Sequence, residues 1–362
     1  MKIRIAKEDL MSAVNTTMKA VPNKTTMQIL ECILITAEND EVRFTANSTE
    51  IGIETFVTAQ ADEEGSVAVE AKTLAPIVSK LPDGEVTLET EGDVLNIKCK
   101  RAKFKLSCRS GEDFPSIEIV SRDNAITMDQ ETLKDVIRQT VFSTSTNDTN
   151  KMMCGELFEV NGDTLKVTAL DGHRVAIRTV NLDRLYGTYK AIIPSKTLQE
   201  LIKLLTEGDV DVYFTDSWIA FSFENTLITS RLIEGDFYDI SKMIKDDFNT
   251  KIEINRQALN DCMERAMLLV KEIDRKPVVF TIEDTLKAEI KSQLGTMDEE
   301  IEIDKEGEDI TIGINPRFLT DVLRSLYEER ITVEFTSSKF PCYIRGEDYI
   351  YIILPIQVRD GV

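Results

Sequence analysis

The stretches KTLAPIVSKL (residues 72–81), KTLQELIKLL (residues 196–205) and RFLTDVLRSL (residues 317–326) share one apolar pattern. In each, leucine, isoleucine or valine stands at the third, sixth, seventh and tenth positions, the spacing that forms one face of an amphipathic helix. The stretches recur about every 120 residues, so the sequence predicts three copies of one domain.

An earlier helix with the same spacing precedes each of these stretches. Its apolar-face residues are Leu10, Ala13, Val14 and Thr17 in the first copy, Leu133, Val136, Ile137 and Thr140 in the second, and Leu259, Cys262, Met263 and Ala266 in the third. Segments such as VRFTANS (residues 42–48) and ITVEFTS (residues 331–337) alternate and are rich in β-branched residues, so they predict strands. We therefore predict an α+β protein of three repeated domains, residues 1–122, 123–248 and 249–362, each with two amphipathic helices packed on antiparallel β-sheets.

The composition of the 362 residues excludes several classes of protein. An apolar content of 42% is enough for packed cores, so a disordered chain is not expected. No run approaches the roughly 18 apolar residues of a membrane helix, and the first residues lack the apolar segment of a signal peptide. The six cysteines form no CxxC pair, so we expect reduced thiols, no zinc site and a cytoplasmic protein.

The sequence offers little for catalysis. It has no GxxxxGK[ST] phosphate-binding loop and no GxGxxG motif at the start of a helix, and we expect neither a cofactor nor a metal. Its single histidine, His173, follows Asp171, so one alternative is a hydrolase in which Asp171 orients His173 against a serine or cysteine. The two residues are too close in sequence for the usual arrangement, and no nucleophile elbow is present. A turn between two strands is the simpler interpretation.

Basic residues recur on the repeated helices of a chain whose net charge is −21. Two positions before the first leucine of each second helix stand Lys72, Lys196 and Arg317. Five or six positions after that leucine stand Lys80, Lys203 and Arg324. All are basic, although Asp and Glu outnumber Lys and Arg by 64 to 43. The first helices add Lys19, Lys134, Arg138, Arg256 and Arg265. One interpretation is an ordinary polar helix face, and the other is a positive stripe that contacts phosphate without reading sequence.

Helix packing sets the size of any ring that these helices line. With helix axes about 9 Å apart, six helices give a ring roughly 17 Å across, which side chains would fill. Twelve helices from two chains give roughly 34 Å, leaving about 24 Å inside, and a DNA duplex roughly 20 Å across fits that space. A ring around DNA therefore requires a dimer in which the first domain of each chain meets the third domain of the other.

The segment ALDGHRVA (residues 169–176) is similar to the TDGHRLA signature of bacterial DNA polymerase III beta subunits, the sliding clamps. The ending YIILPI (residues 351–356) resembles the apolar–Pro–apolar ending of that family, and the length, triple repeat and acidic balance agree over the whole chain. The resemblance implies a non-enzymatic processivity factor, a head-to-tail homodimeric ring around duplex DNA. It further implies that this ring tethers the replicative DNA polymerase, and that a separate ATP-driven clamp loader opens it.

The resemblance also implies which residues form three functional surfaces. The DNA-facing helix surface would comprise Lys24, Lys72, Lys80, Lys134, Arg138, Lys196, Lys203, Arg256, Arg265, Arg317 and Arg324. A hydrophobic cleft for short peptide motifs of the polymerase, the clamp loader and repair proteins would comprise Met153, Leu170, Gly172, His173, Arg174, Val175, Tyr238, Lys242, Met243, Pro341, Ile352, Leu354 and Ile356. The dimer interface would comprise Lys103, Phe104, Lys105, Leu106, Ser107 and Cys108 against Leu268, Leu269, Ile301, Glu302 and Ile303.

The predicted cleft departs from the family pattern at several positions. The chain has Phe237-Tyr238-Asp239-Ile240 where the family usually has Phe-Pro-Asp-Tyr, Lys242 in place of Arg, and Leu170 in place of Thr. We therefore expect a bulkier and more apolar pocket. Besides the hydrolase, a second alternative is a monomeric peptide-binding scaffold unrelated to DNA, which the mass in solution would distinguish.

Overall fold

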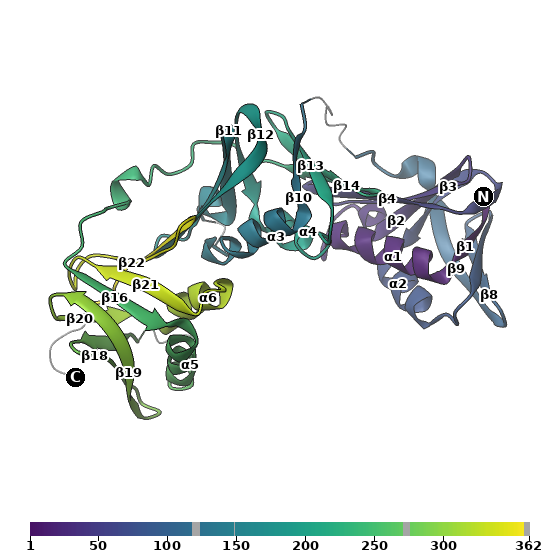
Figure 1. The fold of residues 1–362 in the computed structure, drawn as a ribbon. Coiled ribbons are helices and arrows are strands. Elements are labelled where there is room, and N and C mark those ends of the chain that lie inside the picture. Colours follow the sequence, from purple (N-terminus) through teal and green to yellow (C-terminus); the bar gives the residue numbers. More distant parts are fainter. Residues whose placement is uncertain (118–123, 148, 271–275, 358–362) are drawn as a thin grey trace. The chain divides into compact units, whose positions relative to one another are not determined.

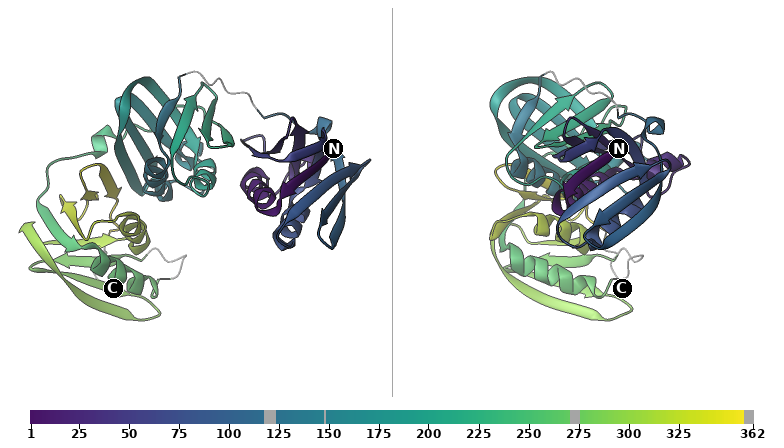
Figure 2. Two further views of the ribbon diagram at one scale, coloured as in Figure 1. Left: turned by 45° about the vertical axis from the view of Figure 1, so that its right-hand side comes forward. Right: turned by 90° about the vertical axis from the view of Figure 1, so that its right-hand side faces the viewer.

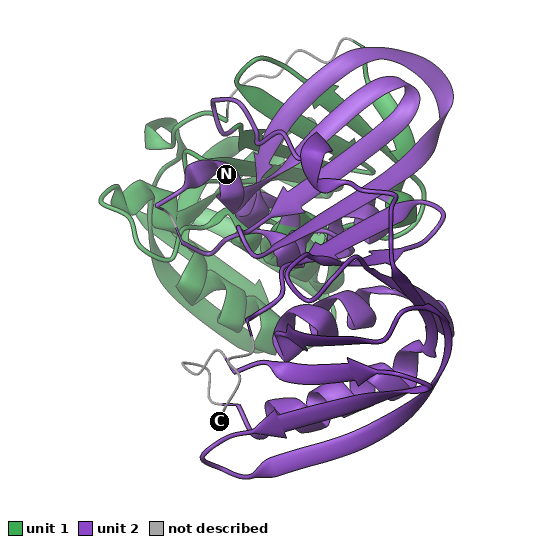
Figure 3. Ribbon diagram, turned by 90° about the vertical axis from the view of Figure 1, so that its left-hand side faces the viewer, with its two compact units in different colours: residues 1–132, 199–232 green, residues 133–198, 233–362 purple. Residues whose placement is uncertain are grey.

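The computed structural model describes residues 1–117, 124–147, 149–270 and 276–357. The chain forms two compact units, one from residues 1–132 and 199–232 and the other from residues 133–198 and 233–362 (Figure 3). Helices α3 (Gln130–Arg138) and α4 (Ser195–Leu201) contribute residues to both units. Within the described ranges, no helix is long and apolar enough to cross a membrane.

The described part of the first unit contains an antiparallel sheet of thirteen strands. Figure 1 labels several of them, among them β2, β3 and β4. Their order is β10-β13-β14-β15-β4-β3-β2-β6-β9-β8-β7-β1-β5. The strands are β1 (Lys2–Ala6), β2 (Cys32–Glu38), β3 (Glu41–Asn47), β4 (Ile51–Thr58), β5 (Gln60–Glu63), β6 (Gly65–Glu70), β7 (Glu85–Glu91), β8 (Val94–Cys99), β9 (Ala102–Ser110), β10 (Ile126–Asp129), β13 (Asp209–Phe214), β14 (Trp218–Phe223) and β15 (Thr226–Arg231). The pairing of β15 with β4, from Thr226↔Thr55 to Ser230↔Ile51, makes the sheet continuous.

Helices α1 (Lys7–Thr17) and α2 (Ala71–Lys80) lie side by side in this unit (Figure 2). The 3₁₀ turns η1 (Met18–Ala20), η2 (Gln28–Glu31) and η3 (Gly111–Asp113) connect its strands and helices. Leu10, Val14, Leu74 and Val78 enter one buried core with sheet residues such as Ile35. Their burial holds the helices on the sheet, because each Å² of apolar surface removed from water contributes about 25 cal/mol.

The described part of the second unit contains a ten-stranded antiparallel sheet in the order β11-β12-β23-β22-β21-β16-β19-β18-β17-β20. The strands are β11 (Gly155–Leu170), β12 (Arg174–Pro194), β16 (Thr250–Asn255), β17 (Val278–Ile282), β18 (Thr285–Lys291), β19 (Thr296–Gly307), β20 (Ile310–Ile314), β21 (Arg330–Phe335), β22 (Cys342–Arg345) and β23 (Tyr349–Ile353). Helices α5 (Arg256–Met267) and α6 (Pro316–Ser325) pack against each other and share a core with the sheet. The 3₁₀ turns are η4 (Val141–Ser143), η5 (Lys151–Cys154) and η6 (Ser241–Met243).

The three copies repeat one strand pairing. The first strand of each copy pairs with the strand that follows its second helix, as β1 with β7, β10 with β13, and β16 with β21. The register is the same in all three, since the last residue of the first strand faces the first residue of its partner: Ala6↔Glu85, Asp129↔Asp209 and Asn255↔Arg330. This confirms the predicted fold of repeated helix pairs on antiparallel sheets.

The apolar stripes predicted from the sequence are buried in all three copies, with two partial exceptions. Ile77, at the sixth position of its stretch, and Ile202, at the seventh, are only half-buried, whereas their counterparts in the third copy, Val322 and Leu323, are 1% and 0% exposed. The helix ends also follow ordinary capping chemistry. Asn255 accepts a hydrogen bond from Ala258 N and Asn315 accepts one from Arg317 N, so each satisfies a backbone donor of the first turn.

Candidate functional site

A cavity of about 320 Å³ lies in the second unit and has an apolar lining. It is lined by His173, Asn315, Phe318, Leu354, Pro355 and Ile356. The rings of His173 and Phe318 stack with centroids 5.9 Å apart and planes inclined by 19°. His173, Leu354 and Ile356 were predicted cleft residues, and the structure brings them together. An apolar cavity with a few polar groups at its edge suits a peptide with apolar anchors.

Backbone hydrogen bonds fix the C-terminal segment that forms one wall of this cavity. Leu354 N donates to His173 O at 2.9 Å, and Ile356 N donates to Gly313 O at 2.8 Å. The segment therefore follows β23 and joins the turn after β11 to the end of β20. Leu354, Pro355 and Ile356 remain only half-buried, so their side chains are available to a ligand.

Asp171 and Arg174 hold the turn that carries His173. Asp171 Oδ1 accepts hydrogen bonds from the backbone N–H groups of His173 (2.9 Å) and Arg174 (3.1 Å), and Asp171 Oδ2 lies 3.0 Å from Arg174 Nε. Arg174 also donates to Asp321 Oδ2 at 2.6 Å, and its guanidinium carbon lies 4.6 Å from the Phe318 ring centroid. Arg174 is thus buried behind Phe318 and supports the wall. Since Asp171 binds the backbone and Arg174, the geometry is that of a structural turn and not of a catalytic dyad.

A second apolar region adjoins these elements. Met153, Leu170, Val175, Met243 and Ile352, all predicted cleft residues, belong to one cluster that also includes Phe237, Ile240 and Tyr343. Gly172 has a φ of +85°, which favours glycine, and a Cβ there would lie 3.9 Å from Met153 Cε. The turn that carries His173 therefore lies next to the Met153 side chain.

The remaining predicted cleft residues are less enclosed. Tyr238 is 43% exposed and its hydroxyl is hydrogen-bonded to Asn150 Nδ2, while Lys242 is exposed and Pro341 is half-buried. The prediction missed Asn315, Phe318 and Pro355. Of these, only Phe318 carried a signal in the sequence, because an aromatic residue beside the buried stripe of a helix has no obvious place in the core.

Most of the predicted DNA-facing side chains are exposed on the described surface. The exposed ones are Lys24, Lys72, Lys80, Lys196, Lys203, Arg265, Arg317 and Arg324, whereas Lys134, Arg138 and Arg256 are half-buried. Arg256 has a structural role as well: it donates to Leu323 O in the last turn of α6 (3.1 Å) and to Glu328 O in the loop that follows the helix (2.8 Å). The contact to Leu323 O satisfies a carbonyl of the last helical turn, where the carbonyl groups have no partner within the helix.

Carboxylates pair with several of these basic residues. Lys203 Nζ lies 2.7 Å from Glu200 Oε1, and Arg324 Nη2 lies 3.0 Å from Glu264 Oε1. Hydrogen bonds from Asn260 and then Arg324 lower the pKa of Glu264, so this carboxylate stays ionised and keeps its partner at neutral pH. The positive charge of the helix surfaces is therefore partly neutralised within the chain, and a phosphate group must compete with these carboxylates.

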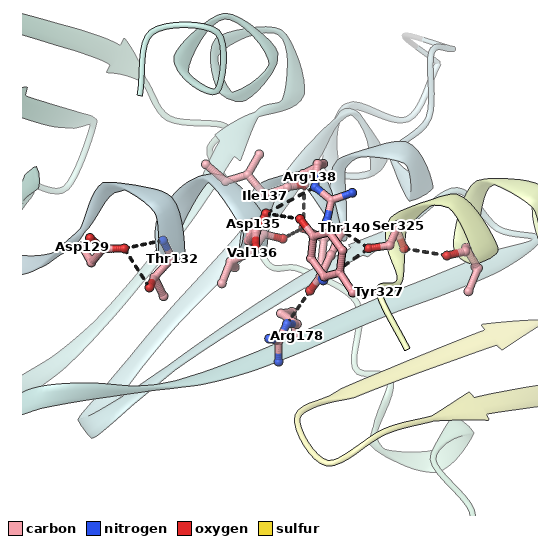
Figure 4. Close-up of polar contacts among 12 residues, drawn as sticks. Asp129, Thr132, Asp135, Val136, Ile137, Arg138, Thr140, Arg178, Ser325 and Tyr327 are labelled. Carbon is pink, nitrogen blue, oxygen red and sulfur yellow. Dashed lines mark hydrogen bonds and ion pairs between the residues drawn. The ribbon is translucent and has the colours of Figure 1, made fainter. Parts of the chain in front are cut away.

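Arg138 shows the same pairing in a larger network (Figure 4). Its Nε lies 3.3 Å from Asp135 Oδ1, its Nη2 donates to Ser325 O at 3.1 Å, and its guanidinium carbon lies 4.6 Å from the Tyr327 ring centroid. The Tyr327 hydroxyl donates to the same Asp135 oxygen at 2.9 Å. Tyr327 is 66% exposed and was not predicted as a site residue.

Two strands, one in each unit, change partners along their length. In β9, Ala102 to Ser107 pair with β8, whereas Cys108 to Ser110 pair with β6. In β19, Thr296 to Glu302 pair with β18, whereas Ile303 to Gly307 pair with β16. Within the described residues, each strand thus offers a stretch with one free edge, and a free edge can pair with another strand.

The two free edges carry opposite charges. The edge of β9 has Lys103 and Lys105, and the edge of β19 has Asp298, Glu300 and Glu302. Phe104, on β9, is 38% exposed, and Leu268, the residue after α5, is 77% exposed; helix α5 contacts β19. Two of the predicted interface residues, Cys108 and Ile301, are instead buried in the cores of their own units. The backbone of Cys108 is also engaged, because it pairs with β6 and its N–H donates to Asp93 O at 2.9 Å.

Comparison with known proteins places these features in one family. Residues 1–118, 127–239 and 241–357 match the N-terminal, central and C-terminal domains of the DNA polymerase III beta subunit. The beta sliding clamp of Bacillus subtilis is 32% identical over 376 residues, covering 99% of this chain and 100% of that protein.

Solved structures agree with this match. A DNA polymerase III beta subunit from Eubacterium rectale superimposes with a TM-score of 0.95 at 45% identity, covering 98% of this chain and 99% of that one. A sliding clamp from Pseudomonas aeruginosa bound to griselimycin gives a TM-score of 0.94 at 25% identity, with 99% and 100% covered.

Proposed function

This chain belongs to the DNA polymerase III beta subunit family, and we propose how its surfaces serve a DNA sliding clamp. As a sliding clamp it is a non-catalytic processivity factor with DNA and a DNA polymerase as partners. A closed ring stays on DNA by topology, so it does not need tight binding. We place this function in the cytoplasm, where a bacterial replication factor meets its DNA.

The ring is a head-to-tail homodimer. The basic edge of β9 in one protomer pairs with the acidic edge of β19 in its partner, and the twofold axis repeats the contact to close the ring. Opposite charges on the two edges favour this pairing over like-with-like contacts, since like charges facing one another are repelled. Phe104 and Leu268 add apolar surface that a partner would cover.

The helix surfaces of the ring contact the DNA backbone weakly. Lys72, Lys196 and Arg317 stand at one position of the repeat, so the three copies present positive charge in a regular array. Attraction to phosphate is independent of base sequence, as sliding requires. The carboxylates beside Lys203, Arg265 and Arg324 reduce this attraction further, so that no single position holds the clamp.

The cleft of the second unit binds short peptide segments of the polymerase, the clamp loader and repair proteins. Two apolar regions support this assignment, the cavity at His173, Phe318 and Leu354 and the cluster around Leu170, Met243 and Ile352. A few apolar anchors in such pockets usually supply most of the binding energy. Griselimycin, to which the Pseudomonas aeruginosa clamp is bound, is proposed as a ligand of this cleft and is a suitable probe.

The observation that carries the proposal is the match of three clamp domains across nearly the whole chain. The test is retention on DNA after loading by the cognate ATP-driven loader, measured on closed circular DNA and on the same DNA after linearisation. An encircling dimer remains on the circle and leaves the linear molecule through its ends. Equal loss from both forms, or a monomeric mass at micromolar concentration, would contradict the ring.

A further inference from the structure

The segment of residues 239–249 (the linker) contains η6, leads to β16 and carries one wall of the proposed cleft. Met243, the last residue of η6, is half-buried in the apolar cluster with Leu170, Val175 and Ile352. The start of the linker is fixed by Asp239, whose Oδ1 accepts a hydrogen bond from Ser241 N at 2.9 Å. The position of Met243 also depends on the contacts of the other end of the linker, which follows Met243 in the chain.

Arg345, the last residue of β22, binds that other end. Its Nη1 lies 2.9 Å from Asp246 Oδ1, and its Nη2 donates to Lys245 O. On the sheet side its Nε lies 3.1 Å from Glu334 Oε2. The Arg345 side chain is only 20% exposed, so this cation is held between the linker and the sheet.

Aromatic rings complete the enclosure of the guanidinium. Its central carbon lies 5.1 Å from the Phe248 ring centroid and 5.4 Å from that of Tyr343, and the two rings meet edge to face at 5.2 Å. Arginine is suited to such a position, because its planar fork makes several directed hydrogen bonds while its faces stack on rings. A lysine keeps the charge but cannot reproduce the fork.

Tyr343 connects this contact set to the cleft. It is 1% exposed, and its hydroxyl donates to Met243 O at 2.7 Å. Its ring belongs to the same apolar cluster as Met243 and Ile352. A continuous series of contacts therefore runs from Arg345 through Tyr343 and the Lys245 carbonyl to the Met243 backbone.

We infer that Arg345 is a positioning residue of the peptide cleft, which fixes Met243 against Leu170 and Ile352 by holding the linker on β22. The inference rests on the proposed function of the cleft. The effect of Arg345 is local to the Met243 side of the cleft. The cavity at His173 and Phe318 is held by separate contacts to Arg174 and Gly313. Arg345 touches no cavity-lining residue in the described contacts.

The test uses the full-length protein and griselimycin as the probe. Arg345→Leu should weaken griselimycin binding about tenfold, mainly through faster dissociation, since a charge-assisted hydrogen-bond set of this size is removed. Arg345→Lys should recover part of the loss. Tyr343→Phe removes only the hydrogen bond to Met243 O and should weaken binding roughly threefold. The matched control is Arg330→Leu, because Arg330 lies on the neighbouring strand β21 and binds Asp304 and Glu253 O instead of the linker.

Methyl NMR of the free protein separates positioning from general loosening. The Met243 methyl signal should shift in Arg345→Leu and Tyr343→Phe while the Leu354 methyl signals stay in place. Unaltered binding and an unaltered Met243 signal in both variants would overturn the role of Arg345, and Tyr343→Phe decides alone if Arg345→Leu does not fold. Absence of griselimycin binding by the unaltered protein would instead contradict the cleft assignment, and the Met243 signal would still test the positioning.

Discussion

Glu156, the second residue of β11, is a carboxyl group with no exposed surface. Its Oε2 lies 3.0 Å from Thr140 Oγ1, and Thr140 Oγ1 lies 2.8 Å from Val136 O (Figure 4 labels Thr140 and Val136). Among the described contacts, Oε1 has no hydrogen-bond partner. Burial raises the pKa of Glu156 well above its usual value, and the Thr140 hydroxyl lowers it only in part. The folded protein therefore favours the neutral acid.

This environment predicts that Glu156→Gln stabilises the protein at alkaline pH. In the unfolded chain Glu156 ionises near its usual pKa, so the folded state binds the proton more tightly and the stability of the natural protein falls as pH rises above that value. Glutamine does not ionise, so the variant avoids this loss. The difference in the free energy of unfolding between the variant and the natural protein should therefore be more favourable to the variant at pH 8 than at pH 4, by roughly 1–3 kcal/mol. Urea unfolding at both pH values measures this. A variant with the same pH dependence as the natural protein would show that Glu156 is not the cause.

At the scale of single elements, the second helix of each copy combines a buried apolar face with an exposed basic one. The buried face follows from the sequence pattern and the structure confirms it. The exposed basic side chains of the helix pairs do not act as an isolated positive stripe. Arg265 Nε, for example, lies 2.8 Å from Glu299 Oε2, a residue of β19. We therefore expect each basic residue to contribute modestly to DNA binding.

Reversing the charge at one repeat position tests the DNA-facing assignment. Lys72→Glu, Lys196→Glu and Arg317→Glu combined should shorten retention on circular DNA at moderate salt. The salt dependence of DNA binding should also become weaker. The slope of the logarithm of the binding constant against the logarithm of the salt concentration should fall by up to about one for each phosphate that is no longer neutralised. Griselimycin binding should not change. The control has the same change in net charge, with Lys98→Glu, Lys190→Glu and Lys339→Glu on exposed strands and loops. Equal losses of retention on DNA in the two triple variants would mean that net charge, and not the position of the basic residues, determines retention.

The C-terminal segment after β23 gives a second prediction at this scale. Leu354→Ala with Ile356→Ala removes two half-buried apolar side chains from the cavity, and griselimycin binding should weaken more than about tenfold. Calorimetry measures the affinity, and the mass of the dimer should stay the same. Leu185→Ala, which shortens a side chain that is 80% exposed on β12, is the control. Unchanged binding by the double variant would place the ligand elsewhere.

The sequence predicted what depends on local periodicity and could not predict what depends on the meeting of distant side chains. Leu319, Val322 and Leu323 lie on one helical face, so their burial follows from spacing alone. Phe318 lines the cavity only because the His173 turn, which lies far away in the chain, packs over it. Likewise, Arg345 binds Asp246, a residue 99 positions away. Such pairings need the folded sheet, and neither charge nor spacing revealed them.

At the scale of the whole molecule, the proposed dimer joins two strand edges that lie in different units. Backbone pairing at an open edge is unspecific by itself, because any strand can supply the hydrogen bonds. Side-chain charge therefore has to select the partner. Lys103 and Lys105 on β9 repel a second β9, and Glu300 and Glu302 on β19 repel a second β19.

A charge exchange tests this selection. Lys103→Glu with Lys105→Glu should leave a monomer of 40.9 kDa at concentrations where we expect the natural protein to be dimeric, and Glu300→Lys with Glu302→Lys should do the same. Equimolar mixing of the two variants should restore a dimer, because each edge then meets its opposite charge. Sedimentation velocity reports the masses. A mixture that stays monomeric would show that the edges are paired in another way.

The pairing of β4 with β15 sets an order of events on the ribosome. Strand β4 is complete at Thr58, yet its partner ends at Arg231, so at typical translation rates the ribosome needs roughly ten to thirty seconds to supply it. During that interval Ile51 to Thr58, an apolar strand, has one edge without its final partner. Nascent chains on one messenger could join through this edge, so protection by a chaperone or by slow initiation would favour correct assembly.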